Sequence, residues 1–268
     1  TAYSVTKVPE PEELVNNQIS YIMASDNNTE LARIVPPEGN RQNVKLDEVP
    51  MSVRQAVLAA EDREFYSNPG FSFKGFFRAF KNNLFGGDLQ GGSTITQQYV
   101  KNYFLSQDRT LSRKAREILI SIKIDDEMSK DQILEDYLNT IYFGRGADGI
   151  QTASQAYFGK DVSKLTPAEG ALLASVIRAP SLYDPSLGPT QRKNATERVD
   201  YVLDGMVQIG SLKQSERASM QYPKVYPQPA AAVETPGPNG LIKRQVMAEL
   251  NKLNISEQQV RTDGLKIT

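Results

Sequence analysis

Cysteine and histidine are both absent from the 268-residue sequence. Without cysteine the chain has no disulfides, no thiolate metal sites and no cysteine nucleophile. Without histidine it has no Ser-His-Asp triad, no His-ligated zinc and no imidazole base. Proton transfer near neutral pH therefore falls to aspartate, glutamate, lysine or tyrosine.

The sequence also lacks a strong net charge and a long apolar run. Its 31 basic and 32 acidic side chains give a formal charge of −1, so no overall field favours nucleic acid. No stretch approaches the roughly 18 apolar residues of a membrane span, and no signal peptide opens the sequence. Because Thr1 is not a natural initiator, we expect a segment of a longer protein.

Composition divides the chain into three parts. Residues 1–46 are polar and interrupted by proline, and "SYIMASDNNTELARIV" predicts two short strands around a turn at residues 26–28. From Met51 to about Tyr222 the sequence shows helical periodicity. Residues 223–268 begin as a proline-rich linker and continue into a helix near residues 241–253. The sequence therefore predicts a mainly α fold with a short N-terminal β-hairpin.

Capping residues predict where several helices begin. Ser129 with Gln132, and Thr166 with Glu169, match the capping-box pattern, in which a hydroxyl and a longer polar side chain bond reciprocally. Ser112 is expected to cap the helix over "LSRKAREILISIKIDDEM".

The stretch "AAEDREFYSNPG" places acids at the end of an apolar helix, directly before two aromatic residues. Glu61 lies one residue beyond the apolar face of that helix. In a cleft with apolar neighbours, its carboxyl group would be suited to act as an acid or a base. The alternative from the pattern alone is a solvated acid at a helix end.

The stretch "GGSTITQQYVKN" joins a glycine-rich loop to a helix that we expect to begin at Ser93 or Thr94. Backbone N–H groups at such a start can hold an anion. Thr94, Gln98, Lys101 and Asn102 recur at roughly helical spacing, so most of them share one face. An ordinary capped helix after a flexible loop is the alternative.

The stretch "RKAREI" concentrates charge in the first turns of the next predicted helix. Arg113, Lys114 and Arg116 stand where the helix dipole disfavours bases, which indicates a local use such as phosphate binding. Glu117 lies among these cations, so we expect it to be charged at neutral pH. A surface ion-pair patch explains the pattern equally well.

Phenylalanine is concentrated in one short region. Seven of the ten phenylalanines lie between residues 65 and 85. Phe76, Phe77 and Phe80 share an apolar face that is interrupted by basic residues, and such a helix can lie in a bilayer interface. A buried core helix is the alternative.

Together these stretches resemble the family 51 glycosyltransferases, the peptidoglycan polymerase domains of class A penicillin-binding proteins. The five motifs of that family are matched in order by "EDREFYSNPG", "GGSTITQQYVKN", "RKAREI", "SKDQILEDYLNTIYFG" and "ERVDYVLDGM". The resemblance covers residues 47–222 and implies a lysozyme-like fold, with a large head lobe and a smaller membrane-associated jaw at approximately residues 70–92. Residues 223–268 would then lead toward a transpeptidase domain that this sequence does not include.

The resemblance implies an inverting transferase that polymerises lipid II. Glu61 matches the general base, which takes the proton from the 4-hydroxyl of the acceptor GlcNAc as that oxygen attacks the anomeric carbon of the donor MurNAc. Undecaprenyl pyrophosphate leaves, and Glu117 matches a second essential acid on the donor side. The positions that match substrate contacts are Asp62, Phe65, Thr94, Gln98, Lys101, Asn102, Arg113 and Lys114. Mostly structural roles are expected for Lys130, Tyr137, Asn139 and Arg198.

The same resemblance sets expectations for cofactors, partners and location. No cofactor is obligatory, although Mg²⁺ or Mn²⁺ could share the charge of the pyrophosphate. Expected partners are lipid II, the growing lipid-linked glycan, moenomycin-type inhibitors and other cell-wall synthesis proteins, but no nucleic acid. The membrane surface would be contacted through Phe76, Phe77 and Phe80. The expected location is the extracytoplasmic face of the bacterial cell membrane, where an N-terminal transmembrane helix outside this sequence would anchor the protein.

Three positions depart from the family pattern, and two other functions remain open. Gly92 stands where alanine is usual in the second motif, and Asp125 stands where glutamate is common at the end of the third segment. Asn68 stands where the first motif usually has histidine, so this side chain can form hydrogen bonds but cannot titrate. A lysozyme-like enzyme that cleaves glycan with Glu61 as acid is one alternative, and the cations around Glu117 argue against it. A non-catalytic scaffold that binds lipid-linked sugars is the other, and the presence of both acids argues against that.

Overall fold

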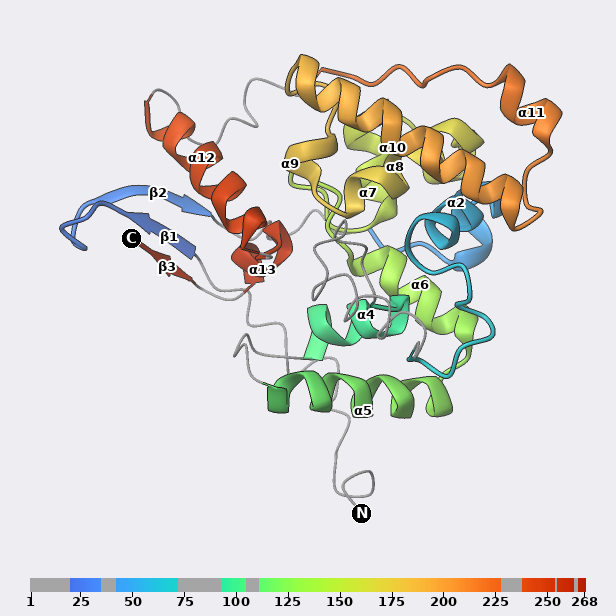
Figure 1. The fold of residues 1–268 in the computed structure, drawn as a ribbon, viewed down its shortest axis with the longest axis horizontal. Coiled ribbons are helices and arrows are strands. Elements are labelled where there is room, and N and C mark those ends of the chain that lie inside the picture. The colour runs from blue at the N-terminus through green and yellow to red at the C-terminus, as the bar shows by residue number, and fades with distance from the viewer. Residues whose placement is uncertain are drawn as a thin grey trace, which may run out of the picture.

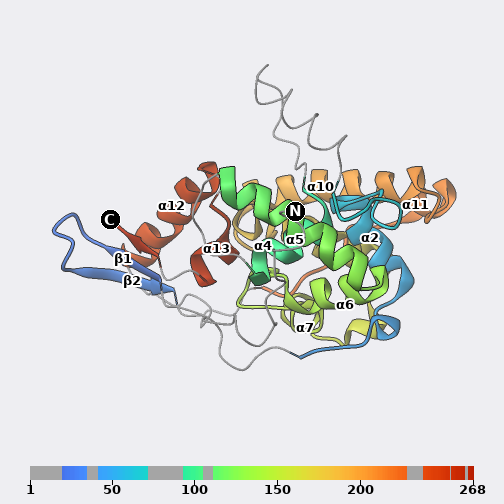
Figure 2. The same ribbon diagram turned by 90° about the horizontal axis from the view of Figure 1, so that it is seen from below.

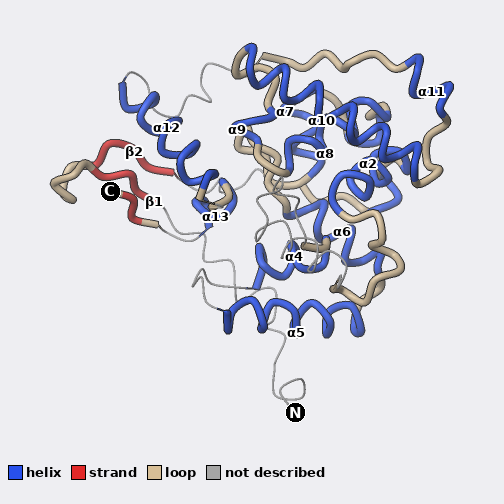
Figure 3. Tube along the Cα trace, in the orientation of Figure 1, coloured by secondary structure: helices blue, strands red, loops and turns tan. Residues whose placement is uncertain are grey.

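The computed structural model describes residues 20–34, 42–71, 93–104, 111–227, 238–253, 255–262 and 265–268. Within these ranges helices predominate, and the strands form one small sheet of three (Figures 1 and 3). The prediction of a mainly α fold with a β-hairpin is confirmed. The expected jaw, with Phe76, Phe77 and Phe80, lies almost entirely outside the described residues. Among those residues no helix is both long and apolar enough to cross a membrane.

Three helices form the centre of the larger, helical body: α2 (Met51–Glu61), α8 (Pro167–Ile177) and α10 (Pro189–Gln208). Helix α8 is buried along most of its length because its sequence is apolar on nearly every side, and α2 and α10 both pack against it. The close approach of α2 depends on Gly170, where an added Cβ would lie 3.0 Å from the Val53 backbone.

A second group of helices lies beside this centre: α4 (Ile95–Phe104), α5 (Leu111–Glu127) and α6 (Lys130–Thr140). Helix α4 packs against both α5 and α6, and Figure 2 shows the three from a second side. The remaining elements of the helical body are η2 (Leu46–Glu48), α7 (Ile150–Phe158), η3 (Val162–Lys164), α9 (Pro180–Tyr183) and α11 (Gln214–Ser219).

Capping residues set the helix starts largely as predicted. Thr166 and Glu169 form the reciprocal capping box at the start of α8. Ser129 accepts a hydrogen bond from the N–H of Gln132 at 3.1 Å and so caps α6. The predicted reciprocal bond is replaced, because the side chain of Gln132 donates to Asp136 at 3.0 Å. Ser112 is different, because α5 begins one residue earlier and Ser112 lies inside its first turn rather than at the N-cap.

The small sheet joins the two ends of the chain. Strands β1 (Ser20–Met23) and β2 (Glu30–Ile34) form the predicted antiparallel hairpin, and β3 (Lys266–Ile267) pairs with β1 in parallel. Helices α12 (Pro238–Lys252) and α13 (Glu257–Thr262) complete this unit. Its own apolar cluster consists of Ile22, Ala32, Ile34, Leu250 and Val260. The first and last parts of the chain, separate in composition, therefore share one sheet and one cluster, at one side of the helical body (Figures 1 and 2).

A buried ion pair fixes the segment that follows α11. Two guanidinium nitrogens of Arg145 each lie 2.7 Å from an oxygen of Asp184, and the two side chains are 2% and 4% exposed. Arg145 also donates to the carbonyls of Ala156 and Tyr226 at 3.0 and 2.9 Å, and it lies 4.0 Å over the ring of Tyr157. One side chain thus holds four parts of the chain together.

Candidate active site

Glu61 is the last residue of α2, and it is held by two other helices. Its Oε2 accepts a hydrogen bond from Nε2 of Gln98 on α4 at 2.9 Å. Its Oε1 lies 3.6 Å from a terminal guanidinium nitrogen of Arg198 on α10, and the two charged side chains are 12% and 13% exposed. A solvated acid at a helix end would lack these partners. Glu61 is instead a largely buried carboxylate with a cation on one oxygen and an amide on the other.

Tyr137 on α6 extends this arrangement from the buried side. Its hydroxyl donates to Oε1 of Gln98 at 3.0 Å, so Gln98 bridges Tyr137 and Glu61. Tyr137 is fully buried. Burial, followed by the nearby charges of Glu61 and Asp62, raises the pKa of the Tyr137 hydroxyl well above its usual value. This hydroxyl therefore stays protonated and acts as a donor at neutral pH.

Asp62 does not share the environment of Glu61, although it is the next residue. One of its oxygens accepts the N–H of Ile95, the first residue of α4, at 3.1 Å. Both oxygens lie 3.1 Å from the side-chain nitrogen of Asn68. Burial raises the pKa of Asp62, and these donors act in the opposite direction. Asp62 thus ties the end of α2 to the start of α4, where the helix dipole favours a carboxylate.

Thr94 has a structural contact on each side of its hydroxyl. The hydroxyl donates to the carbonyl of Gly70 at 2.8 Å and accepts from the N–H of Gln97 at 3.1 Å. The side-chain oxygen of Gln97 accepts the N–H of Thr94 at 2.9 Å, which completes a capping box at the start of α4. The signal for this capping box is present in the sequence as Thr-x-x-Gln at residues 94–97. Thr94 is 2% exposed, and its expected contact with substrate remains a prediction.

Phe65 and Lys130 support the turn that follows Glu61. Phe65 is 1% exposed, and the ammonium of Lys130 lies 4.8 Å from its ring centroid. Lys130 also donates to the carbonyl of Asn68 at 2.6 Å and pairs with Asp125 on α5. Asn68 accepts the N–H of Gly70 through its side-chain oxygen at 3.1 Å. The side-chain amide of Asn68 therefore forms hydrogen bonds at both ends, with Asp62 through its nitrogen and with Gly70 through its oxygen. An uncharged side chain is sufficient for these contacts.

Glu117 lies on α5, and its side chain is 2% exposed. It forms an ion pair with Lys114, one turn earlier on the same helix. Arg116 is exposed, and the side chain of Arg113 is outside the described part of the structure. Lys101 and Asn102 are half-buried in the second half of α4, which packs against α5. Of the third-motif bases whose side chains are described, Lys114 pairs with the buried carboxylate of Glu117, whereas Arg116 is exposed.

The four residues expected to be mostly structural separate into two kinds. Asn139 forms a two-way amide contact with the backbone of Val44, at 3.0 and 2.9 Å, and is structural. Tyr137 and Arg198 lie around Glu61, because Tyr137 contacts Gln98 and Arg198 faces Glu61 itself. Lys130 supports the turn that follows Glu61. Their sequence positions gave no sign of this, because the contacts cross from α6 and α10 to α2 and α4.

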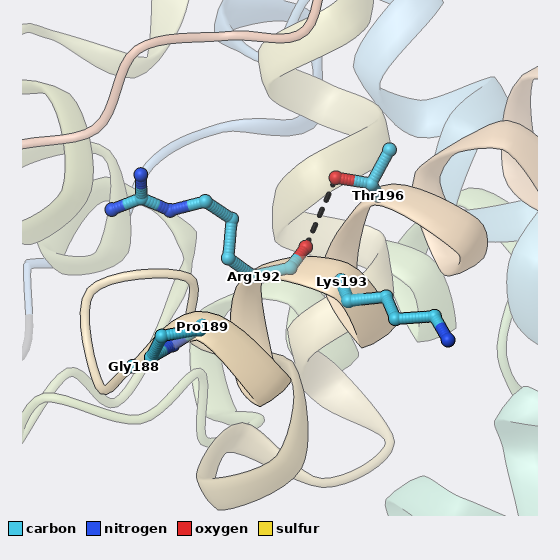
Figure 4. A pocket seen from close by; sticks show the side chains of 5 residues that line it. All are labelled: Gly188, Pro189, Arg192, Lys193 and Thr196. Carbon is cyan, nitrogen blue, oxygen red and sulfur yellow. Dashed lines mark hydrogen bonds between the residues drawn. The ribbon is translucent and has the colours of Figure 1, made fainter.

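The pocket at the start of α10 lies apart from these motif residues. Gly188, Pro189, Arg192, Lys193 and Thr196 line it, and Figure 4 shows Arg192 and Lys193 pointing in opposite directions. The hydroxyl of Thr196 donates to the carbonyl of Arg192 at 2.9 Å. With its two cations diverging, this pocket offers no convergent set of groups for a ligand. Among the described residues no group of three or more acidic side chains is arranged to hold a metal ion.

Comparison with known proteins gives a consistent family. A family model described as transglycosylase matches residues 27–207. Penicillin-binding protein 1A of Mycobacterium tuberculosis is 57% identical over 274 residues, which cover 100% of this chain and 33% of that protein. Penicillin-binding protein 1F of Bacillus subtilis is 41% identical over 229 residues, which cover 85% of this chain and 32% of that protein. The chain spans about a third of the length of these curated relatives.

Among solved structures, penicillin-binding protein 1A from Haemophilus influenzae aligns with 90% of this chain and 25% of its own, at 19% identity and a TM-score of 0.42. The family assignment rests on the sequence matches, which include the motifs around Glu61. The model match covers well over half of the sequence, and this chain therefore belongs to the transglycosylase family.

Proposed function

We propose that this chain is a peptidoglycan glycosyltransferase that polymerises lipid II into β-1,4-linked glycan strands. The observation that carries the proposal is the setting of Glu61, a largely buried carboxylate held by Gln98 on one oxygen and faced by Arg198 on the other. Gln98 on α4 and Arg198 on α10 therefore hold this carboxylate in one place from two different helices. The penicillin-binding proteins among the relatives point to peptidoglycan as the substrate class.

In this proposal Glu61 acts as the general base. It takes the proton of the acceptor GlcNAc 4-hydroxyl while that oxygen forms a bond to the anomeric carbon of the donor MurNAc. The bond from that carbon to the pyrophosphate oxygen breaks, and its electron pair leaves with undecaprenyl pyrophosphate. Attack opposite the leaving group converts the α donor linkage into a β product linkage.

The donor side needs positive charge, because negative charge develops on the pyrophosphate oxygens as the bond breaks. Lys114, Lys101 and Arg113 supply cations on α4 and α5. Glu117, paired with Lys114, would hold that ammonium in place rather than accept the acceptor proton. Asp62 and Phe65 would shape the pocket of the base, while Gln98 would orient it. Thr94 and Asn102 complete the proposed substrate-binding set.

A resident metal ion fits the described residues poorly. Glu117 is paired with Lys114, and the described part of the chain contains no group of three or more acidic side chains that could hold a metal ion. Any Mg²⁺ or Mn²⁺ at the pyrophosphate would therefore be held mainly by phosphate oxygens and water. No step of the proposed reaction depends on such an ion.

The membrane setting follows from the substrate. Lipid II and the growing chain are both anchored by polyprenyl groups, so we propose that the domain works at the extracytoplasmic face of the bacterial cell membrane. Phe76, Phe77 and Phe80 are proposed to contact the bilayer, and an N-terminal transmembrane helix of the intact protein would anchor it. Moenomycin-type inhibitors and other cell-wall synthesis proteins are proposed as further partners.

Product analysis separates polymerisation from glycan cleavage. Purified protein is incubated with labelled lipid II in detergent and, in a parallel reaction, with preformed glycan, and polymer, undecaprenyl pyrophosphate and new reducing ends are measured. A polymerase releases one undecaprenyl pyrophosphate for each linkage formed and makes no new reducing ends. A lysozyme-like enzyme instead makes reducing ends from preformed glycan, and a scaffold makes neither product. Either of the last two results would overturn the proposal.

A further inference from the structure

A chain of contacts runs from the buried interior to Glu61 and crosses three helices. The Tyr137 hydroxyl on α6 donates to Oε1 of Gln98 on α4 at 3.0 Å, and Nε2 of Gln98 donates to Oε2 of Glu61 on α2 at 2.9 Å. Arg198 approaches the other carboxylate oxygen from α10 at 3.6 Å. Both oxygens of the carboxylate therefore have a contact, and the Gln98 side chain that makes one of them is itself held by the hydrogen bond from Tyr137.

The orientation of the Gln98 amide depends on Tyr137. A glutamine amide has an accepting oxygen and a donating nitrogen, and it can turn over to exchange them. A carboxylate can only accept, so it is stabilised when the nitrogen faces it. Because the Tyr137 hydroxyl donates to the amide oxygen, it favours this orientation. Burial keeps Tyr137 a donor by raising its pKa, as described above.

We propose that Tyr137 is a positioning residue for the base and acts through Gln98. By holding the amide with its N–H toward Glu61, Tyr137 fixes the rotation of the carboxylate and leaves a defined lone pair for the acceptor hydroxyl. Reactions of this kind depend on the alignment of the reacting atoms, so a freely turning amide should lower the rate of the bound complex rather than substrate affinity. The role of Glu61 as base rests on the proposed function, whereas the chain of contacts does not.

The alternative is that Tyr137 only fills the core. Tyr137→Phe removes the hydroxyl alone, and Tyr157→Phe is its matched control. Tyr157 is also fully buried, and its hydroxyl donates to the carbonyl of Phe143 at 2.8 Å. Both variants lose one buried hydrogen bond, but only Tyr137→Phe breaks the path to Glu61. A loss of rate caused by weaker packing should therefore appear in both variants.

Steady-state kinetics on lipid II test the proposal in this chain. Tyr137→Phe should lower kcat about three- to tenfold, the effect of one hydrogen bond, with KM unchanged. Tyr157→Phe should match the wild type in both constants. In a Gln98→Met background, Tyr137→Phe should have no further effect, because the residue through which it acts is gone. Equal rates for Tyr137→Phe and Tyr157→Phe, or additive losses with Gln98→Met, would overturn the proposal.

A second measurement does not depend on activity. In protein labelled with ¹⁵N-glutamine, the side-chain amide signals of Gln98 are identified by their loss in Gln98→Met. They should shift in both Tyr137→Phe and Glu61→Gln, and remain unchanged in Tyr157→Phe. If the wild type makes no polymer but these shifts occur, the proposed function fails while the positioning contact stands. If the Gln98 signals do not respond to Tyr137→Phe, the positioning role fails whatever the activity.

Discussion

Replacing Gly70 by alanine should loosen the turn that joins α2 to α4 and α5. Gly70 has a backbone φ of +72°, and an added Cβ would lie 2.5 Å from the Ser121 carbonyl oxygen on α5. Its carbonyl also accepts the hydroxyl of Thr94. A left-handed conformation costs a non-glycine residue about 1–2 kcal/mol, and overpacking costs about 1–3 kcal/mol more. The sum is about 2–5 kcal/mol of unfolding free energy.

Gly146 provides the control that separates these two costs. Its φ is +71°, but an added Cβ would meet no atom within 4 Å. Gly146→Ala should therefore show the backbone cost alone. The difference between the two variants, measured by urea unfolding followed by circular dichroism, should be about 1–3 kcal/mol. Equal stabilities for Gly70→Ala and Gly146→Ala would refute the close packing of this turn against α5.

Two further predictions concern buried charge. Arg145→Met should lower the unfolding free energy by about 3–5 kcal/mol, because Asp184 is left buried without its cation. Thermal unfolding of Arg145→Met is compared with that of the double variant Arg145→Met/Asp184→Leu. A double variant that is no more stable than Arg145→Met would contradict this prediction. Asp62 has its pKa raised in the folded protein above the usual 3.8, so the unfolded state ionises first as pH increases. The stability of wild type relative to Asp62→Asn should therefore fall as pH rises above about 4. If urea unfolding gave the same difference in unfolding free energy between the two proteins at every pH, the raised pKa of Asp62 would be ruled out.

Most of the fold could be predicted from local sequence patterns. The apolar periodicity of residues 51–60, the capping boxes and the hairpin turn each involve neighbours in sequence, and each predicted an element that is present. The parallel pairing of β1 with β3 could not be predicted in this way, because its partners, such as Tyr21 and Lys266, lie at opposite ends of the chain. Only the completed fold brings a two-residue strand to that edge.

In the candidate site, too, local motifs could be identified from the sequence, whereas contacts between distant helices could not. The sequence identified Glu61 and Gln98 from motifs, and the structure brings them into contact. The sequence did not connect Arg198 with Glu61, because nothing in the sequence of one helix indicates which distant helix end its cation will approach. The hydrogen bond from Tyr137 to Gln98 was equally hidden, since the sequence does not distinguish a buried tyrosine whose hydroxyl has such a partner from an ordinary core residue. Thr94 is the reverse case, because its capping pattern was readable and gives it a structural contact.

The most direct test of Glu61 as the base is the turnover of lipid II by Glu61→Gln. Glutamine keeps the size of the side chain but cannot take a proton, so kcat should fall by about 10²- to 10⁴-fold. Glu197→Gln makes the same chemical change beside Arg198, at a side chain that is 67% exposed, and should retain the wild-type rate. A Glu61→Gln variant that polymerises lipid II as fast as Glu197→Gln would contradict the assignment of Glu61 as the base.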